Sequence, residues 1–312
     1  MTEPDGRVNP LRRPENRFHA APALQCTCGG DCQKCHIAVD NTEPCYEIFQ
    51  EVMKDLGALQ EAGLFAVAHG PSRCGKTSLL NRCATSAARA LNAQGVQARE
   101  ISLAHVGQSP DLTTKQRVVM VGRRLAIEAA KTQDVFDSGR YTAPADSGDE
   151  PPTLEEYMRA VGDAVLDGHV LIVRTPRAEQ ATEVAQYWSG TSRKLLIFAE
   201  TTAVNLPHIP EQPVGEAHPL RLNLGILKRG DVAEFARSRI HVPGCGRTFP
   251  DLDIGALETF YGDPPMVTIG AVQKLLYNIY EHYLHNPWPD GNIIRAEDLW
   301  RYVRENPEGQ EG

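Results

Sequence analysis

The sequence contains no long apolar run. No segment approaches the ~20 uninterrupted apolar residues that a membrane-spanning helix requires. The segment MTEPDGRVNPLRRPENRF (1–18) is polar, charged and rich in proline, whereas a signal peptide has an apolar centre. These absences argue against a membrane partner and predict a protein that is soluble and cytoplasmic.

An excess of positive charge is also missing. The formal net charge is −8, with 32 Lys and Arg against 40 Asp and Glu, and the isoelectric point is near 5.7. Proteins that coat nucleic acid or anionic membrane through their overall field carry the opposite charge. The net charge therefore does not indicate a nucleic-acid partner. A local basic patch that binds one is still compatible with it.

Internal repeats are absent as well, but three zones differ in composition. At 312 residues, with 41% of them hydrophobic, the chain is long enough to bury a sizeable core. Residues 1–45 form a cysteine-rich leader, residues 46–218 alternate strand and helix patterns, and residues 219–312 are dominated by helix patterns. We expect a leader, a domain of the α/β class and a small helical subdomain.

The central zone has the pattern of a parallel sheet with flanking helices. The stretches at 63–69, 96–105, 169–175 and 194–202 are predicted strands, and two of them, HVLIVRT and KLLIFAETT, are continuous apolar runs typical of buried parallel strands. Helices are predicted between them at about 115–131 and 177–187, and another begins at Thr153, which has capping-box spacing with Glu156. Gly95 is expected to end the helix that follows the first strand.

The C-terminal zone shows apolar residues at helical spacing. One predicted face contains Val232, Phe235 and Ala236, another contains Val272, Leu275, Leu276, Ile279 and Tyr283, and the last helix is RAEDLWRYVREN (295–306). Its aromatic residues are Tyr277, Tyr280, Tyr283, Trp300 and Tyr302. At this spacing we expect them to pack in the core or between helices rather than to form a binding stripe.

The stretch AVAHGPSRCGKTSLLNRC (66–83) combines a strand, a glycine-rich turn and an amphipathic helix. The turn fits the phosphate-binding pattern G-x-x-x-x-G-K-[ST] at every defined position, with residues Gly70, Pro71, Ser72, Arg73, Cys74, Gly75, Lys76 and Thr77, followed by Ser78. In such a P-loop, backbone N–H groups and the helix N-terminus hold phosphates. Lys76 would reach the β- and γ-phosphate oxygens, and Thr77 would ligate Mg²⁺. We therefore predict a nucleotide site here.

The order of elements from Tyr46 to Asn306 resembles the AAA+ and STAND branch of P-loop ATPases. The matching features are the helix YEIFQEVMKDLGAL (46–59), the P-loop, HVLIVRT in the Walker B place, KLLIFAETT in the sensor-1 place, and PLRLNLGILKRGDVAEFARSRI (219–240) at the crossing from the last strand to the lid. The resemblance implies ATP and Mg²⁺ bound between P-loop and lid. Neither the N-K-x-D guanine reader of GTPases nor an ABC signature is found.

At several positions where members of that branch carry a charged residue, this sequence has a different residue. The Walker B strand should end in acids that hold Mg²⁺ and polarise the attacking water, but Arg174 and Thr175 stand there. Met266, in GDPPM (262–266), occupies the place of the sensor-2 arginine. If the strand order of the branch holds, Glu200 lies beside the P-loop, and we predict that it orients the attacking water while Thr201 or Thr202 senses the γ-phosphate. The alternative is that Glu200 only caps its strand or pairs with an arginine.

The leader packs four thiols and an imidazole into CTCGGDCQKCH (26–36). Cys26, Cys28, Cys32 and Cys35 are candidate ligands of a structural Zn²⁺, with His36 and Cys45 as alternative ligands. An iron–sulfur cluster, redox thiols and a leader without metal are the other interpretations. Cys74, at a helix N-terminus where the pKa of a thiol can fall, is a candidate redox-sensitive residue or a small residue tolerated at a variable position.

The resulting hypothesis is an ATP-binding regulatory or remodelling ATPase that hydrolyses slowly because the Walker B acids are missing. Lys76 and Glu200 would be its catalytic residues. The resemblance favours self-association or a protein partner, as in signalling switches. Two other functions stay open: a non-catalytic nucleotide-binding scaffold, and a P-loop small-molecule kinase, for which Arg73, Arg82, Arg123 and Arg124 are available.

Overall fold

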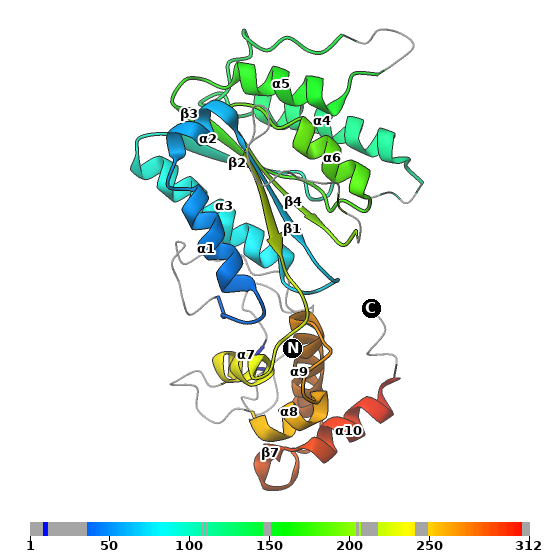
Figure 1. Cartoon of the computed structure of the whole chain (residues 1–312). Coiled ribbons are helices and arrows are strands. Elements are labelled where there is room, and N and C mark those ends of the chain that lie inside the picture. Colours follow the sequence, from blue (N-terminus) through cyan, green and yellow to red (C-terminus); the bar gives the residue numbers. More distant parts are fainter. Residues whose placement is uncertain are drawn as a thin grey trace.

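The protein consists of an α/β lobe and a helical lobe, which are connected after the last strand of the central sheet (Figure 1). The computed structural model describes residues 9–11, 36–107, 109, 111–145, 151–203, 206, 218–240 and 249–307. The α/β lobe contains strands β1–β5 and helices α1–α6, and the helical lobe contains α7–α10. Among the described residues, no helix combines the length and the apolar character needed to cross a bilayer.

Five parallel strands form the sheet of the α/β lobe. They are β1 (Leu64–His69), β2 (Gln97–Ser102), β3 (His169–Arg174), β4 (Leu195–Thr201) and β5 (His218–Asn223). Their order in the sheet is β2-β3-β4-β1-β5, and every neighbouring pair is parallel. All five carboxyl ends therefore lie at one edge, which is where open α/β sheets bind ligands. This confirms the predicted P-loop NTPase α/β fold with flanking helices. β5 belongs to this sheet, although the sequence division at residue 219 assigns most of it to the helical zone.

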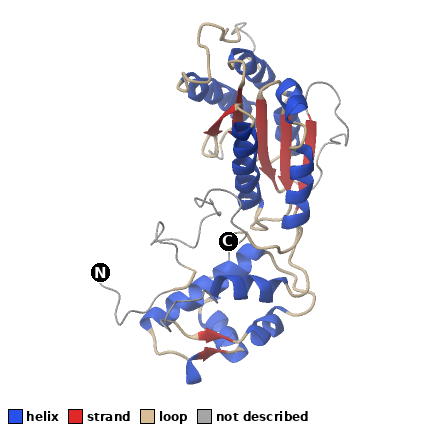
Figure 2. Cartoon of the chain, turned by 90° about the vertical axis from the view of Figure 1, so that its left-hand side faces the viewer, coloured by secondary structure: helices blue, strands red, loops and turns tan. Residues whose placement is uncertain are grey.

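Helices cover both faces of the sheet (Figure 2). They are α1 (Thr42–Val52), α2 (Leu56–Ala62), α3 (Lys76–Ala93), α4 (Thr114–Ala130), α5 (Leu154–Ala164) and α6 (Ala181–Ser189). Along β4, Leu196 and Phe198 pack with α1–α3, whereas Ile197 and Ala199 pack with α4–α6. Because successive residues of a strand face opposite sides, a strand buried on both faces is apolar throughout.

Local signals in the sequence were mostly correct. Leu80, Cys83, Ala84, Ala87 and Leu91 are all buried on α3, as predicted. The Thr153–Glu156 capping box is formed, with the Thr153 N–H donating to Glu156 Oε2 at 2.7 Å. The prediction of a single helix over 46–59 was wrong, because the first helix ends at Val52 and a second one begins at Leu56. There the Asp55 carboxylate accepts the Ala58 N–H at 3.0 Å and starts α2 as a new helix.

The helical lobe has its own apolar core. Its elements are α7 (Asp231–Ile240), α8 (Ile254–Tyr261), α9 (Ile269–His285) and α10 (Ala296–Glu305), with a short pair of strands, β6 (Asp251–Leu252) and β7 (Ile293–Ile294), and the 3₁₀ turn η2 (Asp290–Asn292). Tyr277, Tyr280 and Tyr283 are buried in this core, as expected from their spacing. Trp300 is 53% exposed, but its ring centroid lies 4.4 Å from that of Phe260 in α8, so it packs between two helices as expected.

Candidate functional site

The P-loop (70–77) joins β1 to α3 at the carboxyl edge of the sheet. β1 ends at His69, and α3 begins at Lys76. Gly75 has φ +96° directly before the helix, in a region that glycine adopts without a steric penalty. A Cβ at Gly70 would lie 2.4 Å from the carbonyl oxygen of Leu224, so no side chain fits there. The turn therefore needs both glycines of the motif.

Lys76 is buried within the loop. Its Nζ donates to the carbonyl oxygen of Gly70 at 2.9 Å and to that of Pro71 at 2.5 Å. Burial lowers the pKa of this ammonium, and Cys74 and Glu200 oppose the shift, whereas the positive charge of Arg177 adds to it. Since α3 starts at Lys76, the positive end of the helix dipole adds to the ammonium charge at this point. The charge at this turn therefore favours an anion.

The exposed surface of the loop is formed by Pro71, Ser72, Arg73 and Thr77, while Ser78 is partly exposed. Cys74 is buried, with 1% of its surface exposed. Burial raises the pKa of the Cys74 thiol, and this outweighs the opposing effect of Lys76. The suggestion of a reactive, low-pKa thiol at Cys74 was therefore wrong, and Cys74 acts as a small core residue under the loop.

Glu200 lies directly beside the P-loop. In the sheet, β4 is the neighbour of β1, and Glu200 is paired with Ala68. The hydroxyl of Thr77 donates to Glu200 Oε2 at 2.6 Å. A carboxylate next to a threonine hydroxyl is a set of hard oxygen donors of the kind that Mg²⁺ prefers. The residues present therefore fit a magnesium ion at this position.

The end of β3 carries no acid, as the sequence indicates. Arg174 binds elsewhere: its Nη1 donates to Asn81 Oδ1 at 2.7 Å, and its Nε forms an ion pair with Glu100 at 2.5 Å. Thr175 is buried, with 5% of its surface exposed. Arg174 therefore ties β3 to α3 and β2, and neither residue takes the place of the missing acids.

The two threonines after Glu200 have different environments. Thr201 is fully buried, and its hydroxyl donates to the carbonyl oxygen of Ala178 at 2.8 Å. It faces the α4–α6 side of the sheet, so of the two predicted alternatives the structure favours Thr202 as the sensor. Thr202 is partly exposed and accepts a hydrogen bond from Arg177 Nη2 at 2.9 Å. Arg177 was not predicted as a site residue, although it lies two residues after the strand predicted at 169–175.

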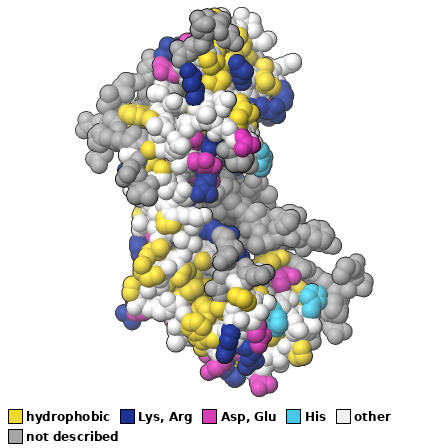
Figure 3. All heavy atoms as spheres, turned by 90° about the vertical axis from the view of Figure 1, so that its right-hand side faces the viewer, with side chains coloured by type: hydrophobic (Ala, Val, Ile, Leu, Met, Phe, Trp, Pro, Cys, Tyr) yellow, Lys and Arg dark blue, Asp and Glu magenta, His cyan; other side chains and the backbone are white. Residues whose placement is uncertain are grey.

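The helical lobe contacts the P-loop through the first turn of α9. The Gly270 N–H donates to the carbonyl oxygen of Arg73 at 2.9 Å. A cavity of about 430 Å³ opens beside this contact, and its lining includes Ser72, Arg73, Phe260, Lys274 and Trp300. Apolar side chains gather on one face of the helical lobe in Figure 3. Met266, which the sequence places where a sensor-2 arginine is expected, is 76% exposed and does not supply a charge to the loop.

The predicted zinc ligands Cys26, Cys28, Cys32 and Cys35 lie outside the described residues. Cys45 is buried in α1, where its thiol donates to the carbonyl oxygen of Asn223 at 3.3 Å. Within the described part of the chain, no group of three or more His, Cys, Asp or Glu side chains is arranged to hold a metal ion. The Nε2 atom of His36 is buried and has no hydrogen-bond partner there.

Comparison with known proteins shows similarity only at the level of structure. No protein-family profile matches the chain, and no curated protein matches it. The ORC2 protein of Aeropyrum pernix is similar, with a TM-score of 0.49 and 12% identity over 93% of this chain and 71% of that chain. Two variants of RuvB from Thermotoga maritima have TM-scores of 0.43 and 0.42 at 12% identity, over 89% and 85% of this chain and 74% and 70% of theirs.

Proposed function

We propose that this protein is an ATP-binding, AAA+/STAND-like regulatory or remodelling ATPase with slow hydrolysis. The observation that carries the proposal is the P-loop itself, with Lys76 inside the turn and Thr77 bonded to Glu200. A strand order of β2-β3-β4-β1-β5 and a helical lobe whose α9 contacts the loop add to it. ATP would lie between the P-loop and this lobe.

The residues of the loop have separate roles in this proposal. The backbone N–H groups of 70–77 and the start of α3 would bind the phosphates. Lys76 would exchange its bonds to the carbonyl oxygens of Gly70 and Pro71 for bonds to the β- and γ-phosphates. Thr77 would hold Mg²⁺, which neutralises charge on the phosphates when it is bound.

Glu200 would be the catalytic carboxylate. Its hydrogen bond to Thr77 fixes it beside the position of the metal, from which it can orient a water molecule toward the terminal phosphate. Because Arg174 and Thr175 replace the acids of β3, this carboxylate would serve both metal and water. We expect slow turnover because Glu200 alone would have to bind the metal and orient the water.

Two other functions are compatible with the same loop. A non-catalytic scaffold is favoured by the ion pair of Arg174 with Glu100, which fills the Walker B place with a structural contact. A small-molecule kinase would use a second substrate as phosphate acceptor. Self-association or a protein partner would transmit the nucleotide state in the first two cases.

The test is Mg²⁺-dependent ATP hydrolysis and ATP binding by the purified protein. We expect slow hydrolysis, complete loss of hydrolysis in Lys76→Ala, and a decrease of roughly 10²-fold or more in Glu200→Gln with binding retained. Lys54→Ala, which changes an exposed lysine outside the loop, is the matched control. Unchanged turnover in Glu200→Gln would exclude the catalytic role of Glu200.

The same assay separates the three functions. Tight ATP binding that depends on Lys76, without turnover, would favour the scaffold. Turnover that starts only when an acceptor is added would favour the kinase. Absence of ATP binding in the wild-type protein would overturn the ATPase and the kinase, and would leave a scaffold whose P-loop is vestigial.

We also propose that the cysteine-rich leader binds structural Zn²⁺ through Cys26, Cys28, Cys32 and Cys35, with His36 or Cys45 as alternative ligands. The zinc would fix the leader on the α/β lobe or present it to a partner. Metal analysis of the purified protein by mass spectrometry tests this. Less than stoichiometric zinc and iron would overturn it.

A further inference from the structure

We infer that Arg177 is the second phosphate-binding cation of the P-loop site, and that it recognises the terminal phosphate of a bound nucleoside triphosphate. This inference rests on the proposed function and adds to it the means by which the site distinguishes a triphosphate from a diphosphate. The observations that carry it are the position of Arg177, the side of the sheet it faces and its polar partners.

The backbone places Arg177 at the carboxyl edge of the sheet, in line with the P-loop. Ala178 forms a parallel bridge with Thr201, and its N–H donates to the carbonyl oxygen of Glu200 at 2.8 Å. Thr201 in turn pairs with His69, the last residue before the loop. The segment that contains Arg177 is therefore connected to the P-loop through a single intervening strand.

The side chain of Arg177 lies on the same side of the sheet as the P-loop residues. Alternate residues of β4 face opposite sides, so Phe198 and Glu200 face α3 while Thr201 faces α4–α6. Arg177 Nη2 donates at 2.9 Å to the hydroxyl of Thr202, two residues after Glu200. The charge of Arg177 is also close enough to affect Lys76.

The guanidinium of Arg177 is available to bind an anion. Arg177 is exposed, and its only polar side-chain partner within the described residues is the neutral hydroxyl of Thr202. Arg174 differs, because Glu100 neutralises its charge. Arg177 and Lys76 thus both place positive charge near Glu200. A planar guanidinium binds phosphate with two parallel hydrogen bonds, which suits a terminal phosphate group.

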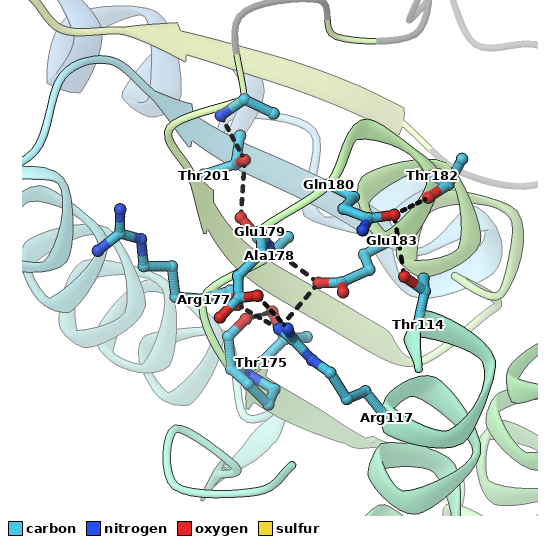
Figure 4. A network of polar contacts seen from close by, with 12 residues as sticks. Thr114, Arg117, Thr175, Arg177, Ala178, Glu179, Gln180, Thr182, Glu183 and Thr201 are labelled. Carbon is cyan, nitrogen blue, oxygen red and sulfur yellow. Dashed lines mark hydrogen bonds and ion pairs between the residues drawn. The ribbon is translucent and has the colours of Figure 1, made fainter. Parts of the chain in front are cut away.

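A buried network holds the backbone of Arg177 in place (Figure 4). Arg117 of α4 donates to the carbonyl oxygen of Arg177 at 3.3 Å and to Glu183 of α6 at 3.1 Å, and it forms an ion pair with Glu179 at 2.6 Å. The Arg177 side chain points away from this network. Arg117 is therefore a positioning residue, which fixes the segment that carries Arg177 and leaves the guanidinium exposed.

The experiment compares the affinities of MgATP and MgADP by calorimetry in wild type, Arg177→Ala and Arg174→Ala. We expect Arg177→Ala to weaken MgATP binding by roughly 10- to 100-fold, the range for one hydrogen bond to a charged group, and to leave MgADP binding nearly unchanged. Arg174→Ala should keep the wild-type ratio of the two affinities. Circular dichroism and the melting temperature show whether each variant folds, and Arg177→Gln repeats the test with a polar side chain of similar shape.

The outcomes distinguish this inference from the proposed function. If wild type binds neither nucleotide, the proposed function fails. If wild type binds MgATP and Arg177→Ala keeps the same ratio of affinities, or loses both equally, only the assignment of Arg177 is overturned. A selective loss of MgATP binding in Arg177→Ala and Arg177→Gln supports it.

Discussion

Burial outweighs charge pairing at Glu183, the buried acid of the network around Arg177. This side chain has 1% exposure and lies 3.1 Å from the guanidinium of Arg117. Burial raises the pKa of the Glu183 carboxyl, while the Glu179 N–H and Arg117 lower it by less. An ion pair taken out of water loses solvation that the mutual attraction does not fully return. The pair is therefore weak as a source of stability, and its value lies in fixing the segment 175–180.

The sign of this pKa shift predicts a dependence on pH. A raised pKa in the folded state means that Glu183 contributes stability that is fully present below the ordinary glutamate pKa near 4.5 and is lost as the pH rises through the folded pKa. Glu183→Gln is neutral at every pH. We expect the free energy of unfolding of wild type, minus that of Glu183→Gln, to decrease from pH 5 to pH 7.5 in urea titrations.

Glu179→Gln is the matched control for that measurement. Its carboxylate pairs with the same arginine, but its side chain is 67% exposed, so this variant separates the loss of a partner of Arg117 from the removal of a buried carboxyl. A difference between wild type and Glu183→Gln that grows with pH would mean that the attraction to Arg117 exceeds the cost of burial.

At the scale of elements, the contact between α9 and the P-loop joins the helical lobe to the candidate site. It depends on a glycine in the first turn of α9. A Cβ at Gly270 would lie 2.8 Å from the carbonyl oxygen and 2.5 Å from the Cβ of Arg73. Both atoms belong to or adjoin the backbone, so they cannot rotate away.

Gly270→Ala is therefore expected to push α9 away from the loop. The overlap should lower the free energy of unfolding by about 1–3 kcal/mol, and it should weaken MgATP binding if the nucleotide lies between loop and lobe. Gly255→Ala in α8 is the matched control, because its nearest neighbour is Asp253 Oδ1 at 3.4 Å. Alanine there should be neutral or stabilise the helix by up to about 1 kcal/mol. Equal stability of the two variants in urea titrations would mean that α9 is free to shift at no cost.

The sequence predicted elements well where one local rule decides the outcome. The apolar runs of β3 and β4 and the capping box at Thr153 depend on burial and on local hydrogen bonds, and both were found as expected. Periodicity did not reveal the break between α1 and α2, because the apolar pattern continues across it while Asp55 starts a new helix. Glu200 could be located from an expected strand order. Arg177 could not, since its exposure depends on which neighbouring acids pair with other arginines.

At the scale of the whole molecule, the two lobes have separate cores. Two apolar clusters cover the faces of the sheet, and a third is confined to the helical lobe and to short segments near the start of the chain. Leu11 and Val39 belong to this third cluster. The beginning of the chain is thus packed against helices that lie near its end.

Asn9 fixes this long-range contact. Its side chain is 3% exposed, and Nδ2 donates to the carbonyl oxygen of Tyr277 at 2.9 Å and to Glu281 Oε1 at 2.7 Å, while Oδ1 accepts the Leu11 N–H at 2.9 Å. Removing this amide takes the acceptor from the buried Leu11 N–H and a donor from Tyr277 and Glu281, which costs about 1–3 kcal/mol. Because the cores are separate, the cost should fall on the helical lobe alone.

Hydrogen exchange measured by mass spectrometry tests this expectation in the full chain. In Asn9→Ala, the amides of α9 should exchange roughly 5- to 150-fold faster, the factor that corresponds to that free energy, while those of β1 and β4 keep their wild-type rates. Thr259→Ala, an exposed substitution in α8, should change neither group. Equal acceleration in α9 and in the sheet would show that the lobes unfold as one unit, and then nucleotide bound at the P-loop would stabilise the whole molecule rather than the α/β lobe first.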